Sequence, residues 1–140
     1  MPSGIRLVHF PDGTTVAAAP LASRRADDPL RDYGLYCDPA WAPTWDADLI
    51  DWPDFGIPTD RSEAVRLIVA AFRRAEAGER VEVGCIGGLG RTGTVLACMA
   101  ILSGVPASEA VEWVRSNYDE RAVETPEQEA WVEAFALSIE

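Results

Sequence analysis

The sequence predicts a single α/β domain in which helices pack on a small mixed β-sheet. Strand-like runs dominate the first part of the chain, and apolar side chains recur at helical spacing after residue 60. In addition, the strand-like residues 81–85 lead through a glycine-rich segment into the apolar run 94–102, as expected of a loop between a strand and a helix. A chain of 140 residues, 48% of them hydrophobic, can enclose one core, so we assign residues 1–140 to one domain.

Paired strands are expected at the start of the chain. The triplet Pro-Asp-Gly at residues 11–13 separates two apolar runs, residues 5–10 and 14–18, and such a triplet favours a hairpin turn. His9 is the only histidine, and its place in a strand beside a turn indicates a structural or exposed residue. The segments expected next are a polar loop at 21–31 and short strands at 34–37 and 49–52.

The first two helices have recognisable ends. Asp60 and Glu63 form a capping-box pattern, and the helix that they open should end at Gly78. The second helix follows the glycine-rich segment and should end near Gly104. The expected inward residues of the first helix are Ala64, Leu67, Ile68, Ala71 and Phe72.

Two more helices are expected near the end of the chain. Pro106 suits the first position of a helix over residues 107–118. Thr125 and Gln128 form a second capping-box pattern, with Pro126 at the first helical position. The expected inward residues are Ala110, Val111 and Val114 in the third helix and Ala130, Trp131, Ala134 and Phe135 in the fourth.

The glycine-rich segment has the composition of an anion-binding loop. Its unpaired N–H groups and the positive end of the following helix would meet at one point, and glycines let the backbone curve around an anion. Cys85 lies at the mouth of the loop, and thiols at helix N-termini near cations form reactive thiolates. Arg91 can bind two phosphate oxygens through its planar guanidinium. The predicted phosphate-binding residues are Ile86, Gly87, Gly88, Leu89, Gly90 and Arg91.

Two motifs resemble the protein tyrosine phosphatase superfamily. In the first, five residues separate Cys85 from Arg91, and Thr92 follows, as in the family signature. In the second, residues 52–58 resemble the mobile acid loop of the same family. The resemblance implies a protein tyrosine phosphatase-like fold and hydrolysis of phosphate monoesters, above all phosphotyrosine in proteins, through a cysteinyl-phosphate intermediate. Dual specificity, or a non-catalytic relative that binds phosphoproteins, are the alternatives.

The resemblance also implies a role for each catalytic candidate. Cys85 would attack phosphorus while Arg91 holds the phosphoryl oxygens, and Asp54 would protonate the leaving oxygen. Thr92 would stabilise the thiolate as it leaves in the second step. Gln128 would place the hydrolytic water, although its capping-box position also explains a glutamine there.

The chain departs from the family pattern at two positions. Gly84 stands where the family generally has the histidine that orients the cysteine, and Glu124 stands where its first glutamine would be. Gly84 therefore either weakens the nucleophile or meets a local need of the backbone or packing.

Trp41, Trp45 and Trp52, with neighbouring prolines, are expected to form one packed cover beside the site.

Other interpretations of the loop explain fewer residues. Gly88, Gly90 and Gly93 fit a dinucleotide-binding fingerprint, but that loop has no use for an internal arginine or a cysteine at its mouth. Cys85 as a plain buried thiol would leave the spacing to Arg91 unexplained. Cys37 is either an ordinary buried thiol or a redox partner of Cys85.

The amino-acid composition restricts the classes of partner and the cellular compartment that we expect for this protein. A net charge of −11 and a pI near 4.4 disfavour nucleic acid and anionic membranes. Three cysteines, an odd number, favour a reducing compartment, and no apolar run is long enough for a membrane span. We therefore expect a cytoplasmic, monomeric protein with no cofactor or metal, acting on a phosphorylated protein or peptide.

Overall fold

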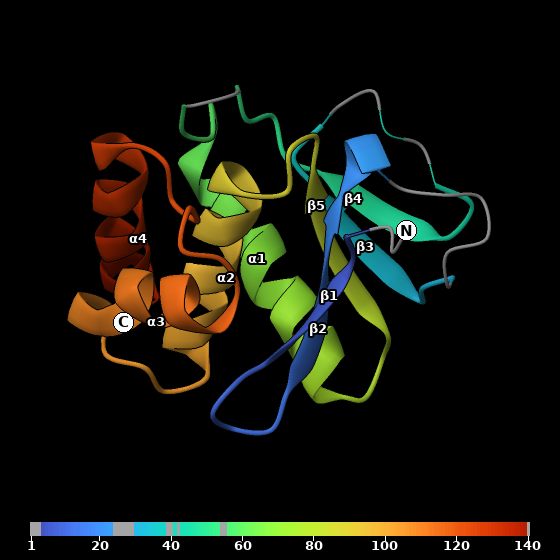
Figure 1. The fold of residues 1–140 in the computed structure, drawn as a ribbon, viewed down its shortest axis with the longest axis horizontal. Helices are drawn as coiled ribbons and strands as arrows, with labels where there is room; N and C mark the ends of the chain where they lie inside the picture. Colours follow the sequence, from blue (N-terminus) through green and yellow to red (C-terminus); the bar gives the residue numbers. More distant parts are fainter. Residues whose placement is uncertain (1–3, 24–29, 39–40, 42, 54–55, 140) are drawn as a thin grey trace.

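The computed structural model describes the whole chain except residues 1–3, 24–29, 39–40, 42, 54–55 and 140. A mixed five-stranded sheet runs in the order β1-β2-β5-β3-β4. The strands gather on one side of the view in Figure 1, and the helices pack together on the other. The first pair of strands is antiparallel and the other pairs are parallel. The α/β class with a small mixed sheet is therefore confirmed.

The expected hairpin forms from β1 (Arg6–His9) and β2 (Thr15–Pro20). Gly13 supplies a φ of +94° in the turn, and the Thr14 N–H donates to the Asp12 carboxylate at 3.0 Å. His9 is exposed, and its Nδ1 lies 3.1 Å from the Thr15 hydroxyl, so it takes the structural place that was expected.

The central strands are β5 (Val81–Cys85) and β3 (Tyr33–Tyr36), with β4 (Asp46–Leu49) at the edge. The strand expected at residues 49–52 lies instead at 46–49, so that prediction was wrong. The pairing of β4 with β3 runs from Tyr33↔Asp46 to Tyr36↔Leu49. Because β3 ends at Tyr36, a longer β4 would have no partner strand, and residues 50–52 leave the sheet.

Four α-helices follow the expected order: α1 (Arg61–Glu76), α2 (Gly90–Leu102), α3 (Ala110–Asn117) and α4 (Pro126–Ser138). Both predicted N-caps form, because Asp60 accepts from the Glu63 N–H and Thr125 accepts from the Gln128 N–H, each at 3.1 Å. The helix expected from residue 107 begins with a short 3₁₀ turn, η2 (Ala107–Glu109). Pro106 has an extended ψ of 143° and therefore precedes that turn.

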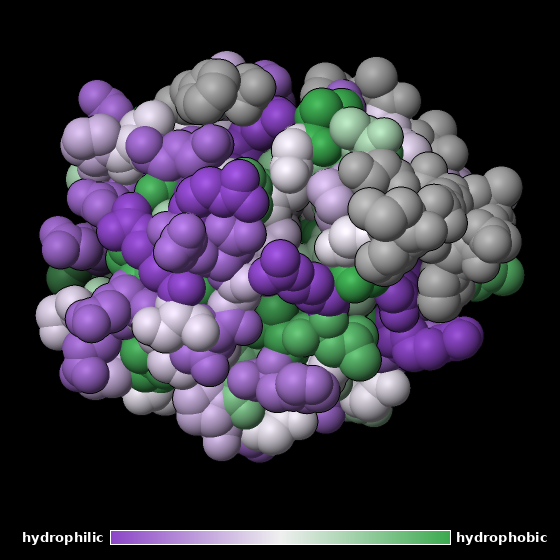
Figure 2. All heavy atoms as spheres, in the orientation of Figure 1, coloured by the Kyte–Doolittle hydropathy of each residue, from purple (hydrophilic) through white to green (hydrophobic). Residues whose placement is uncertain are grey.

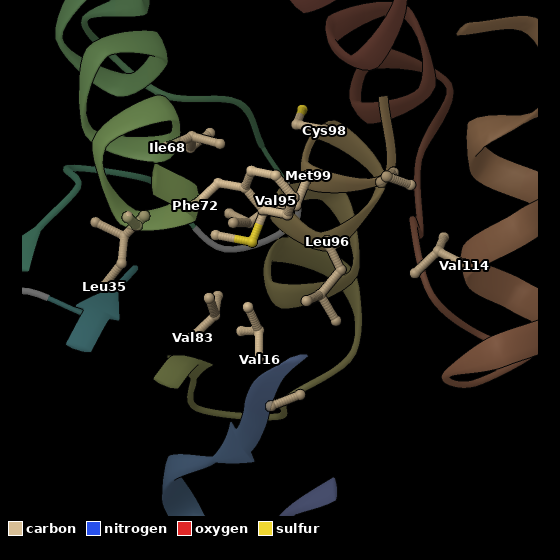
Figure 3. Close-up of a cluster of buried hydrophobic side chains, with 14 of the residues drawn as sticks. Val16, Leu35, Ile68, Phe72, Val83, Val95, Leu96, Cys98, Met99 and Val114 are labelled. Atoms are coloured by element: carbon tan, nitrogen blue, oxygen red, sulfur yellow. The ribbon is translucent and has the colours of Figure 1, made fainter. Parts of the chain in front are cut away.

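The main core lies between the sheet and α2, whose residues 90–100 are all buried. Figure 3 shows Phe72 of α1 facing Val95 and Met99 of α2, with Val83 of β5 pointing toward the same space. Ala130, expected to face inward, is exposed. Helix α4 contacts the core through a different set of buried residues: Gln128, Trp131, Val132 and Phe135.

The opposite face of the sheet carries a second, smaller cluster around Tyr36, which packs with Ala19 and Leu21. Trp41 and Trp45 cover this cluster, whereas Trp52 is buried in the main core and packs on Trp131. The three tryptophans therefore do not form one cover, and that prediction was wrong. The polypeptide at Trp52 has left the sheet and lies on the helical side.

The outer surface is largely polar. Figure 2 shows hydrophilic residues over α3 and α4, where the exposed side chains include Glu112, Glu127, Glu129 and Glu133. Among the described residues, no helix is long and apolar enough to cross a membrane.

Candidate active site

The candidate site begins where β5 ends. Cys85 is the last residue of β5, and α2 begins at Gly90, so residues 86–91, here called the cradle loop, join the strand to the first turn of the helix. The Cys85 side chain is 2% exposed, and the Thr92 hydroxyl donates to its sulfur at 3.0 Å. The predicted nucleophile and the predicted thiolate-stabilising hydroxyl are therefore in contact.

The carbonyl groups of the cradle loop have partners on its outer side. The Ala22 N–H donates to the Ile86 oxygen at 3.1 Å, and the Tyr118 hydroxyl donates to the Gly88 oxygen. In the first turn of α2, the Gly93 N–H donates to Leu89 O at 2.8 Å and the Thr94 hydroxyl to Gly90 O at 2.7 Å. In a trans peptide the N–H points opposite to the carbonyl, so these bonds direct N–H groups to the other side of the loop.

Those N–H groups remain available for a ligand. Within the part of the chain that the structure describes, no residue accepts a hydrogen bond from the N–H groups of residues 86–90. The start of α2 adds the positive end of its dipole at the same place. This arrangement can bind a tetrahedral dianion above the sulfur of Cys85.

Space around the backbone requires glycine at one position of this region and disfavours a side chain at a second. Gly88 has a φ of +71°, and a Cβ there would lie 2.8 Å from the Cα of Pro20. A Cβ at Gly90 would lie 1.9 Å from a carboxylate oxygen of Glu124. The first contact is with backbone and cannot yield, whereas Glu124 is an exposed side chain.

Arg91 connects the cradle loop to two other segments. Its Nη1 donates to the carbonyl oxygens of Cys37 and Trp52, both at 2.9 Å, and the side chain is buried. Cys37 directly follows β3, whereas Trp52 begins the acid loop, which we define as residues 52–56. The guanidinium is therefore held by backbone carbonyls from two separate segments.

The described residues of the acid loop are joined by two hydrogen bonds. The indole N–H of Trp52 donates to the Gly56 oxygen at 2.7 Å, and the Gly56 N–H donates to Pro53 O at 2.9 Å. Asp54, the predicted acid, lies outside the described residues. Asp51, by contrast, accepts from the Thr59 hydroxyl at 2.9 Å in the stretch leading to α1.

The side chain of Gln128 is hydrogen-bonded to the acid loop. Its Nε2 donates to the Gly56 oxygen at 3.0 Å, and its Oε1 accepts from the Glu124 N–H at 2.8 Å. A capping-box glutamine would instead reach back to the N–H of Thr125, one residue later. The buried Gln128 thus links the start of α4 to the loop that carries Asp54, and its predicted role in placing water stays a prediction.

Cys37 is the neighbour of Cys85 on the adjacent strand. The register pairs Tyr36 with Gly84, and the Cys37 N–H donates to Gly84 O at 2.9 Å. The two cysteines therefore follow paired positions of parallel strands. Complete burial, followed by the charge of Cys85, raises the pKa of the Cys37 thiol far above its usual range.

Packing explains the glycine before Cys85. Gly84 does not have a positive φ, so backbone strain does not require it. A Cβ at Gly84 would lie 3.0 Å from each of three atoms: Ala19 O, Leu21 Cδ2 and Tyr36 Cδ1. The position on the opposite face of β5 is thus already filled.

Two contacts of the site were not predicted from the sequence. Ala22 and Tyr118 hold cradle-loop carbonyls, but each lies far from the loop in the chain. Neither belongs to a motif, and only the fold brings them to residues 86–88. An aromatic residue with a hydroxyl near the end of a helix gives no signal of such a role.

The sequence relatives of the chain include phosphatases. Residues 54–133 match the family model described as "PTP-SAK: Swiss Army Knife protein, DSP-PTPase phosphatase domain". Two uncharacterized proteins of Methanocaldococcus jannaschii are 43% and 42% identical over 107 residues. Those alignments cover 68% of this chain, and 69% and 64% of the relatives, so the chain spans about two thirds of their length. The human tyrosine-protein phosphatase non-receptor type 4 is 31% identical over 96 residues, which are 64% of this chain and 10% of that protein.

Solved structures show the same fold. A mutant form of Tk-PTP superposes with a TM-score of 0.73 at 24% identity, covering 94% of this chain and 95% of that one. Kinase associated phosphatase, with its catalytic-site cysteine replaced by serine, superposes with a TM-score of 0.75 at 14% identity, covering 96% of both chains. These likenesses show the fold, and the match over residues 54–133 shows that the chain belongs to the dual-specificity type of the protein tyrosine phosphatase superfamily.

Proposed function

We propose that this protein hydrolyses phosphate monoesters through a cysteinyl-phosphate intermediate, with phosphotyrosine in proteins as its substrate. The observation that carries the proposal is the contact between the Thr92 hydroxyl and the Cys85 sulfur at the floor of the cradle loop. In this proposal the N–H groups of the loop bind the phosphoryl group together with Arg91, whose guanidinium is held by two backbone carbonyls. Membership of the dual-specificity phosphatase family supports the same chemistry.

In the first step, the thiolate of Cys85 attacks phosphorus in line with the ester oxygen. A P–S bond forms, the P–O bond to the leaving group breaks, and Asp54 transfers a proton to the departing oxygen. The cradle-loop N–H groups and Arg91 bind the three other phosphoryl oxygens, on which charge resides in the transition state. Arg91 suits this task because its guanidinium stays charged and is already oriented by the carbonyls of Cys37 and Trp52.

In the second step, water attacks phosphorus and the P–S bond breaks. Asp54 accepts the proton of that water, and inorganic phosphate leaves. Thr92 donates its hydroxyl hydrogen to the sulfur, which stabilises the thiolate as it is released. Gln128 is the candidate for orienting the water; its bond to Gly56 places it against the acid loop.

Exposed apolar residues beside the site support an aryl phosphate as substrate. Ile86 directly follows Cys85 and is 46% exposed, and the exposed Pro53 directly follows the carbonyl that binds Arg91. Both can contact the ring of phosphotyrosine. Tyr33 and Tyr36, the two aromatic residues of β3, are buried and cannot line the mouth of the site.

Turnover of p-nitrophenyl phosphate and of matched phosphotyrosine and phosphoserine peptides tests the proposal. Cys85→Ser should abolish turnover and keep binding of inorganic phosphate, because the N–H groups and Arg91 remain. Retention of more than about 1% of activity would contradict a thiolate mechanism, since residual catalysis without the nucleophile is far smaller. Phosphate binding without turnover by the wild type would identify a non-catalytic relative, and a higher kcat/KM on phosphoserine would refute the aryl preference.

A further inference from the structure

Tyr118 makes a hydrogen bond to the cradle loop that the proposed reaction steps do not use. It directly follows α3, is 8% exposed, and donates its hydroxyl to the carbonyl oxygen of Gly88. We infer that Tyr118 is a positioning residue whose bond fixes the Gly88–Leu89 peptide with the Leu89 N–H facing the bound phosphoryl group. The inference rests on the proposed function, because it concerns the same anion cradle.

The geometry of the peptide unit connects Tyr118 to the ligand. The carbonyl of Gly88 and the N–H of Leu89 belong to one planar trans unit and point in opposite directions. A carbonyl bound to Tyr118 outside the loop therefore turns the Leu89 N–H to the inside. Gly88, with its φ of +71°, is a residue whose backbone rotates at little cost, so an external contact is needed to select one orientation.

The neighbouring peptides of the loop are fixed in other ways. Ile86 O is held by the Ala22 N–H, and Leu89 O is held within the first turn of α2 by Gly93. Between these two fixed points, Tyr118 supplies the partner that the structure gives to the Gly88 carbonyl. The central peptide of the cradle therefore depends on a side chain, whereas its flanks depend on backbone.

Tyr118 is itself held in place and protonated. The guanidinium of Arg6, on β1, donates to the Tyr118 carbonyl and lies 5.7 Å from the centre of its ring. Burial, and then the negative charge of Cys85, raise the pKa of the Tyr118 hydroxyl to about 12, so it donates at neutral pH.

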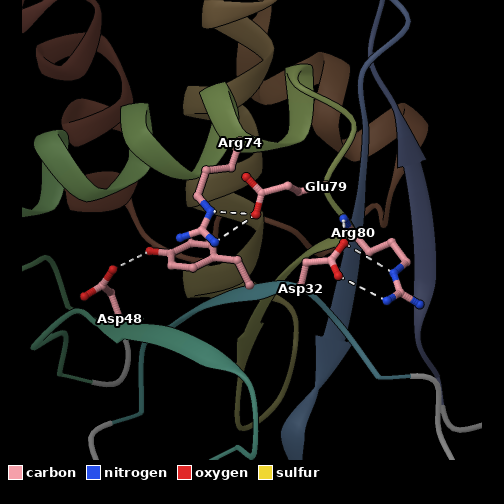
Figure 4. A network of polar contacts seen from close by, with 6 residues as sticks. Asp32, Asp48, Arg74, Glu79 and Arg80 are labelled. Carbon is pink, nitrogen blue, oxygen red and sulfur yellow. Dashed lines mark hydrogen bonds and ion pairs between the residues drawn. The ribbon is translucent and has the colours of Figure 1, made fainter.

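Tyr33 provides a matched control for a change at Tyr118. It is also buried, at 2% exposed, and its hydroxyl donates to Asp48 at 2.7 Å. The guanidinium of Arg74 lies 4.1 Å from its ring centre, as Arg6 lies over Tyr118, and Figure 4 shows Arg74 and Asp48 in this network. Tyr33 pairs with Val81, at the end of β5 opposite to Cys85. Loss of either hydroxyl removes one hydrogen bond of a buried tyrosine, but only the Tyr118 hydroxyl contacts the cradle loop.

The test compares Tyr118→Phe with Tyr33→Phe and the wild type. The dissociation constant of orthovanadate, kcat/KM on p-nitrophenyl phosphate and the urea midpoint are measured for each. Tyr118→Phe should bind vanadate roughly 10- to 100-fold more weakly, which corresponds to one hydrogen bond to a charged group. Its kcat/KM should fall by a similar factor, because the same N–H binds the transition state. Tyr33→Phe should leave both values within about twofold of the wild type while lowering the urea midpoint comparably.

Three results would decide against the inference. A folded Tyr118→Phe variant with wild-type vanadate affinity would show that Tyr118 only stabilises the fold. If that variant does not fold, Arg6→Gln, which loosens Tyr118 without removing it, should weaken vanadate binding by a smaller factor, and unchanged affinity would overturn the inference. A wild-type protein that neither binds vanadate nor hydrolyses the ester would instead overturn the proposed function, and the inference with it.

Discussion

Gly84→His introduces the residue that the family generally has before its cysteine. We expect this change to lower the stability of the folded protein. The position lies on the face of β5 opposite to Cys85, in the cluster of Ala19, Leu21 and Tyr36. A Cβ alone would approach one atom of each of these residues to 3.0 Å. Because Ala19 contributes a backbone oxygen, that contact cannot be relieved by a rotamer change.

The ring of Tyr36 occupies the space that an imidazole would need. It lies over Gly34, where a Cβ would be 2.2 Å from the ring, and it touches the space above Gly84. Its hydroxyl donates to Glu82 at 2.9 Å and accepts from the Trp45 indole at 3.0 Å. Tyr36 is thus held on both sides and cannot swing out without breaking buried hydrogen bonds.

The expected loss of folding stability in Gly84→His follows from overpacking of this cluster. Forcing extra methylene groups into a filled core costs about 1–3 kcal/mol, and histidine adds more than one such group. We therefore expect Gly84→His to lose at least about 3 kcal/mol of a total stability of about 5–15 kcal/mol. At roughly 3 °C per kcal/mol for a chain of this size, the melting temperature should fall by about 10 °C.

Thermal and urea unfolding, followed by circular dichroism, measure this cost. The matched variant is the double change Gly84→His with Tyr36→Ala, which removes the ring from the contested space. The double variant should be at least about 1 kcal/mol more stable than the sum of the two single effects predicts, because the two sites are in contact. A Gly84→His protein as stable as the wild type, with faster alkylation of Cys85 below neutral pH, would refute packing as the reason for the glycine.

Three further predictions concern the site itself. Asp54→Asn should lower the rate on a poor leaving group by roughly 10² to 10⁴ and much less on an activated phenol; equal losses in steady-state assays would exclude Asp54 as the acid. Gln128→Ala should lower kcat and the melting temperature together, because the acid loop loses a buried bond; an unchanged kcat would remove Gln128 from the mechanism. Mild hydrogen peroxide should convert Cys85 to a sulfenic acid that condenses with Cys37 to a disulfide and water. Mass spectrometry checks this, and a bridge from Cys85 to Cys98 alone would contradict it.

Elements with local signals were predictable from the sequence. The Pro-Asp-Gly turn between β1 and β2, the Asp60 cap of α1 and the Thr125 cap of α4 each depend on residues within a few positions of one another. The contact of Thr92 with Cys85 was predictable for the same reason, because both residues lie close together in the chain on one strand–loop–helix unit. The family motif records this unit, so the sequence is sufficient to place it.

Elements that depend on distant partners were not predictable in the same way. The limits of β4 are set by pairing with β3, and its sequence Asp-Ala-Asp-Leu has little strand propensity of its own. Trp41 and Trp52 were grouped by closeness in the sequence, but β4 lies between them in the chain and they pack in different clusters. The backbone N–H of Gln128 donates to the Thr125 cap, whereas its side-chain amide donates to Gly56, a residue far away in the chain.

The cradle loop shows why its motif alone does not make an anion site. A glycine-rich loop supplies N–H groups, but glycine also permits each peptide to rotate and turn its carbonyl toward the ligand. Here the direction of the peptides is imposed by Ala22 from η1 (Leu21–Ser23), by Tyr118 after α3, and by the first turn of α2. These elements are separated in the chain and meet only when the sheet and helices are assembled. The affinity for phosphate should therefore depend on the folded scaffold, and variants of Tyr118 that spare every residue of the motif should still bind phosphate more weakly.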